Sequence, residues 1–297
     1  MQDSLHDVIV PKKNGKVNTH IELFLRFTGT GAGCYNGWQQ CMEGETHLKQ
    51  QICRLRAMIN ESGRIAFLGG AGVSTESGIP DFRSEEGHFS AIRAFGETPE
   101  VLLSHSFFMQ YPERFFAYYR SSLLVTDVQP NRAHAALAEL EKRGKLTAVI
   151  TQNVDGLHQK AGSKNVLELH GSIYRNRCMQ CGRVFGPDAI SSSEGVPHCP
   201  CGGIIKPEVV LYEEGLDSDV LRSAIAHIMR ADMLIVGGTS LAVYPAAGLI
   251  DYYRGNRLVL INKSETPYDD RANLVLHASI GEVLWEAIKM EGEGEQA

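Results

Sequence analysis

The sequence predicts an α/β protein built on a doubly wound, mostly parallel sheet. Short apolar runs, which are typical of buried strands, alternate with segments of helical period. Two of these runs lead directly into glycine-rich turns, at residues 69–72 and 237–238. Alternation of this kind is typical of parallel sheets covered by helices on both faces. The alternation of strands and helices holds outside the cysteine-rich segment 178–201. A chain of 297 residues is long enough for one large domain or for a large and a small one.

The composition is that of an ordinary globular protein, with 43% hydrophobic and 22% charged residues and a net charge of −6. The acidic balance argues against a broad nucleic-acid-binding surface. No apolar run approaches the roughly 20 residues that cross a bilayer. The run IELFLRF at 21–27 is too short and too charged for a secretory signal. We therefore expect a cytoplasmic monomer with no membrane partner and no direct nucleic-acid binding.

The first 41 residues have no clear helical or strand period, and we expect an extension that is disordered or not part of the native protein. The spacing of Gly29, Gly31 and Gly33 is similar to that of a nucleotide-binding loop, but no helical pattern follows these residues, so we do not expect such a loop here. From 46 to 62 apolar residues recur at helical spacing, and Gly63 ends the run, which predicts a helix.

The apolar run at 65–68 predicts a buried strand, and the glycine-rich turn 69–72 and a helix start follow at once. In α/β folds such a turn lets a pyrophosphate approach the backbone, and the N–H groups of the helix start point at it. A tight turn with no ligand is an equally good interpretation of the glycines alone. The loop 77–84 carries an acid, an aromatic ring and an arginine side by side, which suits closure over a ligand; an ordinary surface loop is the alternative.

Residues 88–125 are rich in aromatic side chains, and we expect them to form the packed core of a small helical insertion. Asn131 is predicted to cap a helix that runs to about residue 143 and stops at Gly144. The run 146–150 predicts a second buried strand. Polar residues just beyond such a strand lie in the ligand crevice, although the same residue types also serve as turn and cap residues. They are Gln152, Asn153 and Asp155.

His170 follows a predicted strand at 166–169. A lone histidine in this position is more often structural than catalytic. Its ordinary pKa near 6.5 nevertheless allows it to act as a general base at cellular pH.

Four cysteines form the pairs Cys178-x-x-Cys181 and Cys199-x-Cys201, separated by a further 17 residues. Each pair brings two thiolates to one side of a tight turn, and two such turns predict a tetrahedral zinc site. Four thiolates leave no open position on the metal, so the zinc is expected to be structural. His198 is a competing but weaker candidate ligand.

The last third of the chain repeats the strand–turn pattern. A strand at 231–236 leads into the second glycine-rich turn, and a helix is expected from about Tyr244. Further strands are expected at 257–261 and 274–276, and a final helix near Gly281.

Several of these segments closely resemble signatures of the sirtuins, the NAD-dependent protein deacylases. They are GAGVSTESGIPDFRS from Gly70, TQNVDGLH from Thr151, LHGS from Leu169, the two cysteine pairs, and GTSLAVYPAA from Gly238. The resemblance covers about residues 42 to 290, with the signatures in the order of the family. It implies a bacterial-type protein lysine deacetylase that transfers the acetyl group from lysine to ADP-ribose and releases nicotinamide and O-acetyl-ADP-ribose.

The resemblance also implies two domains with the active cleft between them. A Rossmann-like NAD-binding domain would comprise residues 42–80, 131–171 and 208–297, after the extension 1–41. A small domain would comprise the helical insertion 81–130 and the zinc ribbon 172–207.

Carried over by motif, His170 would be the catalytic base, and Asn153 and Asp155 would line the nicotinamide pocket. The implied zinc ligands are Cys178, Cys181, Cys199 and Cys201. The implied contacts to NAD are Gly70, Ala71, Gly72, Thr75, Asp81, Phe82, Arg83, Gln152, Asn153, Val154, Asp155, Gly238, Thr239, Ser240, Asn262, Lys263 and Ile280, the last through its backbone. The implied contacts to an acylated-lysine peptide, which would add to a strand edge, are Val210, Leu211, Tyr212 and Val243.

Two positions depart from patterns seen in the family. Members that prefer acidic acyl chains carry a Tyr-x-x-Arg pair, whereas this chain has Tyr119 followed by Ser122, which favours acetyl or other uncharged acyl groups. Glu213 stands where a glycine is more usual, so the peptide contact is expected to differ there.

Two other functions are the alternatives to a deacetylase. One is a sirtuin-like mono-ADP-ribosyltransferase; the other, in another class, is a non-catalytic zinc-ribbon binding module that uses Arg175, Arg177 and Arg183.

Overall fold

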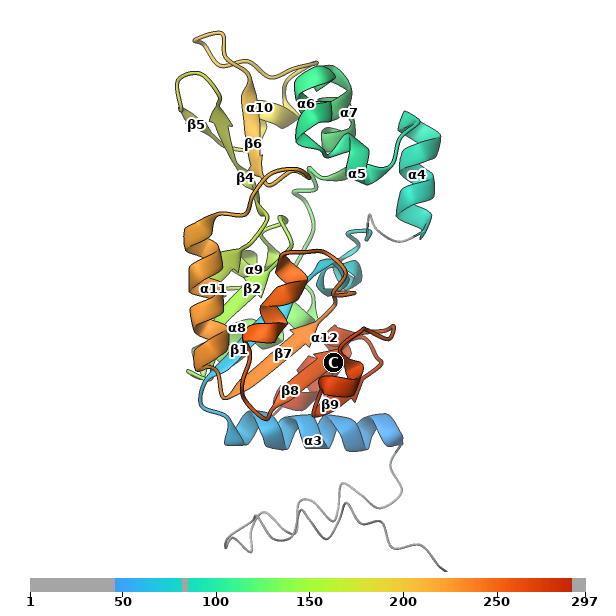
Figure 1. Cartoon of the computed structure of the whole chain (residues 1–297), viewed down its shortest axis with the longest axis vertical. Helices are drawn as coiled ribbons and strands as arrows, with labels where there is room; N and C mark the ends of the chain where they lie inside the picture. Colours follow the sequence, from blue (N-terminus) through green and yellow to red (C-terminus); the bar gives the residue numbers. More distant parts are fainter. Residues whose placement is uncertain (1–45, 82–84, 290–297) are drawn as a thin grey trace, which may run out of the picture. The chain divides into compact units, whose positions relative to one another are not determined.

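A computed structural model describes the backbone at residues 46–81 and 85–289 and the side chains at 46–81 and 89–289 (Figure 1). The predicted extension 1–41 lies outside the described residues, and so do Phe82 and Arg83. Within the described part of the chain, no helix is long and apolar enough to cross a membrane.

A parallel sheet of six strands forms the larger layer, in the order β3-β2-β1-β7-β8-β9. The strands are β1 (Ile65–Gly69), β2 (Leu146–Thr151), β3 (Val166–Glu168), β7 (Met233–Gly237), β8 (Leu258–Ile261) and β9 (Leu274–Leu276). The chain starts at the centre, moves out to β3 and then returns to continue from β7. The order therefore reverses between β1 and β7, which is the switch point where doubly wound folds bind ligands.

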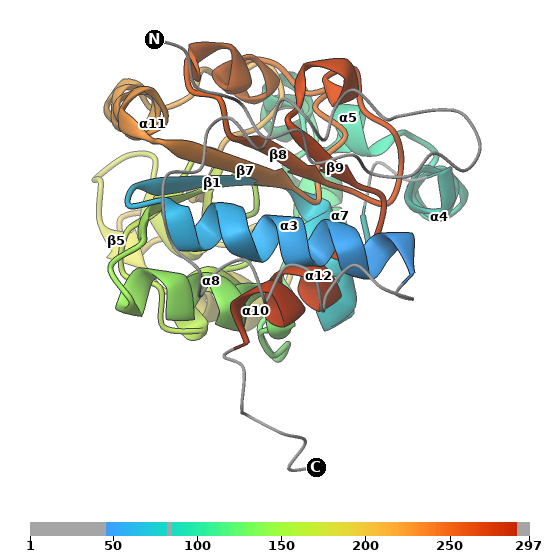
Figure 2. The same ribbon diagram turned by 90° about the horizontal axis from the view of Figure 1, so that it is seen from below.

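Helices cover both faces of this sheet, as Figure 2 shows for α3, α8 and α12 on one side and α11 on the other. Their bounds are α3 (His47–Glu61), α8 (Arg132–Lys142), α9 (Leu157–Lys160), α11 (Ser218–Arg230) and α12 (Ile280–Ile288), with 3-10 helices η3 (Ala246–Tyr252) and η4 (Asp269–Arg271). Alternate residues of β1 face opposite cores: Ile65 and Phe67 pack toward α3, α8 and α12, and Ala66 and Leu68 toward α11. Burial on both faces explains why this strand is a continuous apolar run.

A smaller antiparallel sheet has the order β5-β4-β6, from β4 (Gly171–Cys178), β5 (Val184–Phe185) and β6 (Ile205–Val209). Beside it lie α4 (Glu85–Phe95), α5 (Pro99–Leu102), α6 (His105–Gln110), α7 (Pro112–Ser122) and α10 (Asp188–Ser191). The predicted aromatic core of the insertion is confirmed for Phe107, Phe108, Phe115, Phe116, Tyr118 and Tyr119. Phe89 does not belong to it, because its side chain is 77% exposed.

The predicted helix beyond the first glycine-rich turn is wrong in type. Two single 3-10 turns form instead, η1 (Ala71–Val73) and η2 (Thr75–Ser77). Gly78 then adopts a left-handed conformation with φ of 87°, and Pro80 follows two residues later, so no α-helix can propagate. The cap of α8 is as predicted: Ala133 N donates to Asn131 Oδ1 at 2.9 Å, and Gly144 follows the helix with φ of 71°.

Candidate active site and metal centre

A cavity of about 260 Å³ opens beyond the carboxyl ends of β1 and β2. It brings together residues that the sequence singled out in five separate segments. Among those that line it are Ala71, Asp81, Gln152, Asn153, Val154, Asp155, His170, Val210, Leu211, Tyr212 and Val243. The side chains of the three predicted catalytic residues therefore share one cavity with the predicted peptide-binding edge.

The two glycine-rich turns pack directly against each other at the switch point. The backbone N–H of Gly72 donates to the carbonyl of Gly238 at 2.8 Å. A Cβ atom at Gly70 would lie 2.9 Å from Thr239 Cβ, and one at Gly72 would lie 2.8 Å from Gly238 Cα. Larger residues are excluded here by the partner turn itself, so the glycines let the two turns pack in contact at the switch point, where doubly wound folds bind nucleotide phosphates.

Ser74 joins two of the predicted catalytic side chains. Its hydroxyl donates to Asp155 Oδ2 at 2.7 Å and accepts from Asn153 Nδ2 at 2.9 Å. The other carboxylate oxygen of Asp155 accepts from the backbone N–H of Leu157 at 2.9 Å. Burial raises the pKa of Asp155 above its ordinary value, and these hydrogen bonds oppose the rise. Ser74 was not among the predicted site residues, although a hydroxyl directly after a glycine-rich turn was a usable signal.

The orientation of His170 is set by its Nδ1 atom, which lies 2.9 Å from the carbonyl oxygen of Gln152. A carbonyl can only accept, so Nδ1 carries the proton and the Nε2 atom of the neutral ring carries the lone pair. The carbonyl of His170 accepts from the backbone N–H of Val210 at 2.9 Å. The predicted base is therefore one hydrogen bond away from the predicted peptide-binding edge.

The remaining predicted cofactor residues lie along the same edge of the sheet but do not line the cavity. Thr239 accepts from Gln152 Nε2 at 3.1 Å, which connects the second turn to the end of β2. Asn262 and Lys263 follow β8 directly. Ile280 is the first residue of α12, and its buried side chain packs against Gly237. The group outside the cavity lining comprises Gly70, Gly72, Thr75, Gly238, Thr239, Ser240, Asn262, Lys263 and Ile280.

Tyr119 is a core residue rather than a pocket residue. Its side chain is fully buried and stacks on Phe115, and its hydroxyl finds no hydrogen-bond partner among the described residues. The insertion contributes Pro99, Leu103 and Leu123 to the cavity instead. No lysine or arginine occurs among the described residues that line it.

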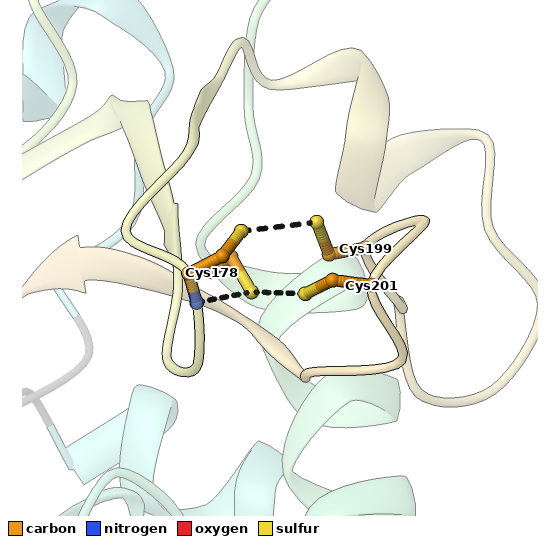
Figure 3. Close-up of side chains that lie close together, drawn as sticks. Cys178, Cys199 and Cys201 are labelled. Carbon is orange, nitrogen blue, oxygen red and sulfur yellow. Dashed lines mark hydrogen bonds between the residues drawn. The ribbon is translucent and has the colours of Figure 1, made fainter.

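The four cysteines converge as predicted, and Figure 3 shows their sulfurs facing one another from two loops of the smaller sheet. Cys178 Sγ lies 3.4 Å from Cys201 Sγ, Cys181 Sγ lies 3.6 Å from Cys199 Sγ, and all four sulfurs lie within 4.8 Å of one another. A tetrahedral zinc with Zn–S bonds of about 2.3 Å separates its sulfurs by about 3.8 Å, so the set fits zinc. His198 is not in this cluster; its Nδ1 lies 3.2 Å from the carbonyl of Gly202.

Taken together, the fold and the site are those of a nucleotide-binding α/β protein that has a cavity at the switch point of its sheet and four cysteines placed to hold a metal ion. The family model described as the Sir2 family matches residues 70–245. The chain belongs to this family.

Curated relatives support this over most of the chain. An NAD-dependent protein deacetylase of Clostridium acetobutylicum is 56% identical over 239 residues, covering 80% of this chain and 98% of the relative. Its counterpart in Clostridium perfringens is 58% identical over 243 residues, covering 81% of this chain and all of the relative.

Solved structures agree. A Sir2 homologue in complex with NAD is 42% identical, with a TM-score of 0.72, covering 79% of this chain and 91% of that one. A complex of Sir2 with a p53 peptide and NAD is 38% identical, with a TM-score of 0.69, covering 78% of this chain and 94% of that one.

Proposed function

We propose that this protein is an NAD-dependent protein lysine deacetylase, which moves the acetyl group from lysine to ADP-ribose. The observation that carries the proposal is the single cavity shared by Asn153, Asp155, His170 and the edge 210–212. A cofactor pocket, a base and a peptide-binding edge are the three elements that such a reaction needs. The relatives at 56–58% identity bear the name of this activity.

The two glycine-rich turns would hold the pyrophosphate of NAD. They meet at the switch point, where the glycine-rich turns of doubly wound folds bind dinucleotide phosphates. The remaining predicted contacts along the sheet edge, Asn262, Lys263 and Ile280, would reach the adenosine end. Bound NAD supplies an activated ribose carbon, C1′, from which nicotinamide departs.

Ser74, Asn153 and Asp155 would orient the nicotinamide. Their mutual hydrogen bonds hold both polar side chains in one arrangement before the ligand arrives, so little reorganisation is needed. His170 would accept a proton from a ribose hydroxyl at Nε2, since Nδ1 is committed to the carbonyl of Gln152. The apolar lining would keep competing water away from the ribose.

The acylated peptide would lie between Val210–Tyr212 on one side and Val243 on the other. Both segments line the cavity. Residues 210–212 follow β6, and their N–H groups are bonded within the chain to His170, Glu214 and Leu103, so the peptide would contact the groups of this segment that face the cavity rather than add along a free strand edge. Pro99, Leu103 and Leu123 present only apolar surface, which favours acetyl and other uncharged acyl groups. The four cysteines would hold structural zinc, fastening the loops at both ends of the ribbon.

The domain boundaries stay a proposal: the smaller sheet begins at Gly171 and ends at Val209, close to the proposed limits 172 and 207. The cytoplasmic location, the monomeric state and the absence of nucleic-acid binding stay predictions.

The test is to incubate the protein with an acetyl-lysine peptide, with and without NAD, and to identify the products by mass spectrometry. O-acetyl-ADP-ribose that forms only when both are present is the expected result. Release of nicotinamide with ADP-ribose attached to protein, and no loss of acetyl, would instead establish an ADP-ribosyltransferase. The variant His170→Ala is expected to keep its peptide affinity and lose turnover; wild-type turnover would disprove the assignment of the base.

A further inference from the structure

Glu213 adopts a backbone conformation that glutamate rarely takes. Its φ is 74°, in the left-handed region. The backbone N–H of Glu214 donates to the carbonyl of Leu211 at 3.0 Å, so residues 211–214 form a β-turn with Glu213 at its third position. A positive φ there is the mark of a type II turn, which normally places glycine at this point. A residue with a Cβ is strained in this conformation, so glutamate is retained here at some cost in stability.

The side chain of Glu213 makes contacts that glycine could not make. Its Oε2 accepts from the backbone N–H of Ser106 at 2.9 Å, and its Oε1 accepts from Ser106 Oγ at 2.8 Å. Ser106 lies in the first turn of α6, whose backbone N–H groups have no partner within the helix. These hydrogen bonds hold the pKa of Glu213 below its ordinary value, so the group is a carboxylate at neutral pH.

Neighbouring contacts join the same two segments. The backbone N–H of Tyr212 donates to Leu103 at 3.0 Å, and the carbonyl of Tyr212 accepts from His105 at 3.0 Å. Glu214 contacts His105 Nδ1 at 2.9 Å through Oε1 and Lys206 Nζ at 3.2 Å through Oε2. The turn is therefore fastened to the start of α6 by both backbone and side chains.

The opposite end of this segment is fastened to the predicted base, because Val210 N donates to the carbonyl of His170. All of residues 210–214, Glu213 included, line the cavity together with Leu103, which precedes α6. The segment 210–214 thus spans the distance between the catalytic end of the cavity and the helical insertion that forms its apolar wall.

We propose that Glu213 is a positioning residue for the acylated peptide: its contact with Ser106 holds the peptide-binding segment and the apolar wall of the cavity in register. This rests on the proposed function. Glycine at position 213 would relax the turn, but Ser106 would then lose the hydrogen bonds that it donates to Glu213. The residue acts through the segment 210–212 and needs no contact with the reacting atoms.

Two variants separate the contact from the strain. Glu213→Gly removes both, whereas Glu213→Ala removes the contact and keeps a Cβ in the left-handed conformation. We expect both to raise the peptide KM by the same factor, about five- to ten-fold, with kcat and the KM for NAD changed less than about two-fold. Glu213→Ala should melt at a lower temperature than Glu213→Gly. If the variant with the lower melting temperature also has the higher peptide KM, the strain and not the contact determines peptide binding, and the proposal is overturned.

Asp217→Ala is the matched control. Asp217 also accepts helix N-terminal amides, those of Asp219 and Val220, but it does not line the cavity. This variant should lose stability and keep the peptide KM of the parent protein. Glu213→Gln, which keeps one acceptor, should fall between the parent and Glu213→Ala in peptide KM.

Hydrogen exchange provides a readout that does not depend on catalysis. Amides in the first turn of α6 should exchange faster in Glu213→Ala than in the parent, while those of α11 should not change. Unchanged exchange at α6 would show that the contact does not hold this helix, and it would overturn the proposal even in an active enzyme. If Glu213→Ala shows this exchange effect but the parent protein forms no O-acetyl-ADP-ribose, the proposed function has failed and the contact stands. Its effect is then measured as acetyl-peptide affinity.

Discussion

Ser74 is the residue on which the polar end of the cavity depends. It is 1% exposed, and its single hydroxyl bonds to the carboxylate of Asp155 and to the amide of Asn153. Removing it leaves a buried carboxylate with one donor fewer, which costs more than an ordinary hydrogen bond contributes. Both side chains then lose the arrangement that fits them to a ligand.

Ser74→Ala is therefore expected to lower the rate of nicotinamide release by about 10- to 100-fold while leaving acetyl-peptide affinity unchanged. Ser62→Ala is the control, because Ser62 is equally buried but donates to the carbonyl of Met58 on α3, away from the cavity. Parental turnover in Ser74→Ala would show that Asn153 and Asp155 hold their positions without it.

His134 and His158 form a second buried polar pair, with ring centroids 4.7 Å apart. Burial lowers the pKa of His134 to about 4 and that of His158 well below its ordinary value, so both rings are neutral at pH 7. In the unfolded chain a histidine takes up a proton near pH 6.5. The unfolded state thus gains protons first on acidification, and the stability present above pH 6.5 is lost as the pH falls toward 4.

We expect the free energy of unfolding to drop by about 2 kcal/mol between pH 7 and pH 5 through His134 alone. His134→Gln should flatten this acid limb, since glutamine also suits the third position of a capping box with Asn131. Urea titrations from pH 5 to pH 8 measure it, with His47→Gln on the exposed face of α3 as the control. If the free energy of unfolding falls with pH equally in the parent protein and in His134→Gln, the loss of stability in acid does not come from His134.

At the scale of elements, we expect the cysteine-bearing end of the ribbon to depend on its metal and the large sheet not to depend on it. Around the four sulfurs, the buried cluster consists of Cys178, Cys199 and Ile205, with Phe185 and Ala189 partly buried against it. The other ends of β4 and β6 are held differently, because Ile173 and Val209 pack into the aromatic core of the insertion. The large sheet has two extensive cores that contain none of these cysteines.

Chelation of the metal, or Cys199→Ser, should open the ribbon while the parallel sheet persists. Trypsin is then expected to cut after Arg183, an exposed residue of the loop between the two ends of the metal site. Mass spectrometry of the fragments and zinc analysis of the intact protein measure both effects, and added zinc should restore resistance after chelation. Resistance to trypsin in a zinc-free protein would contradict this prediction.

The large strands could be predicted because each is an apolar run long enough to be buried on both faces, as at 65–68 and 146–150. The cysteine cluster was equally predictable from its spacing. The 3-10 turns after β1 were only partly predictable: Gly78 and Pro80 mark the local stop in the sequence, but the contact of Gly72 with Gly238 is remote in sequence. The role of Ser74 as a shared hydrogen-bond partner was not predictable, because its two partners come from another segment.

At the scale of the whole molecule, the cavity combines a polar end beside the cofactor turns with an apolar wall from the insertion. A carboxylate carried into the apolar part would meet no basic side chain among the described residues that line it. Burying an unpaired charge costs several kcal/mol even after partial solvation.

Peptides with butyryl-lysine and succinyl-lysine test this point, because the two acyl chains have the same number of carbons and differ in one carboxylate. We expect kcat/KM for the succinyl peptide to be at least about 100-fold lower than for the butyryl peptide. Comparable values would show that a cation reaches the acyl chain.

The strand order has a consequence for how the chain is made. β1 sits at the centre of the sheet, yet one of its neighbours is β7, and the backbone of Arg64 meets Asp232 across 168 residues of sequence. At a ribosomal speed of roughly 5 to 20 residues per second, about 10 to 30 seconds separate the synthesis of the two strands. Throughout that interval, the edge of the apolar strand β1 that pairs with β7 has no partner on the nascent chain. During synthesis, a strand edge of the kind that promotes aggregation therefore stays unpaired until β7 has been made.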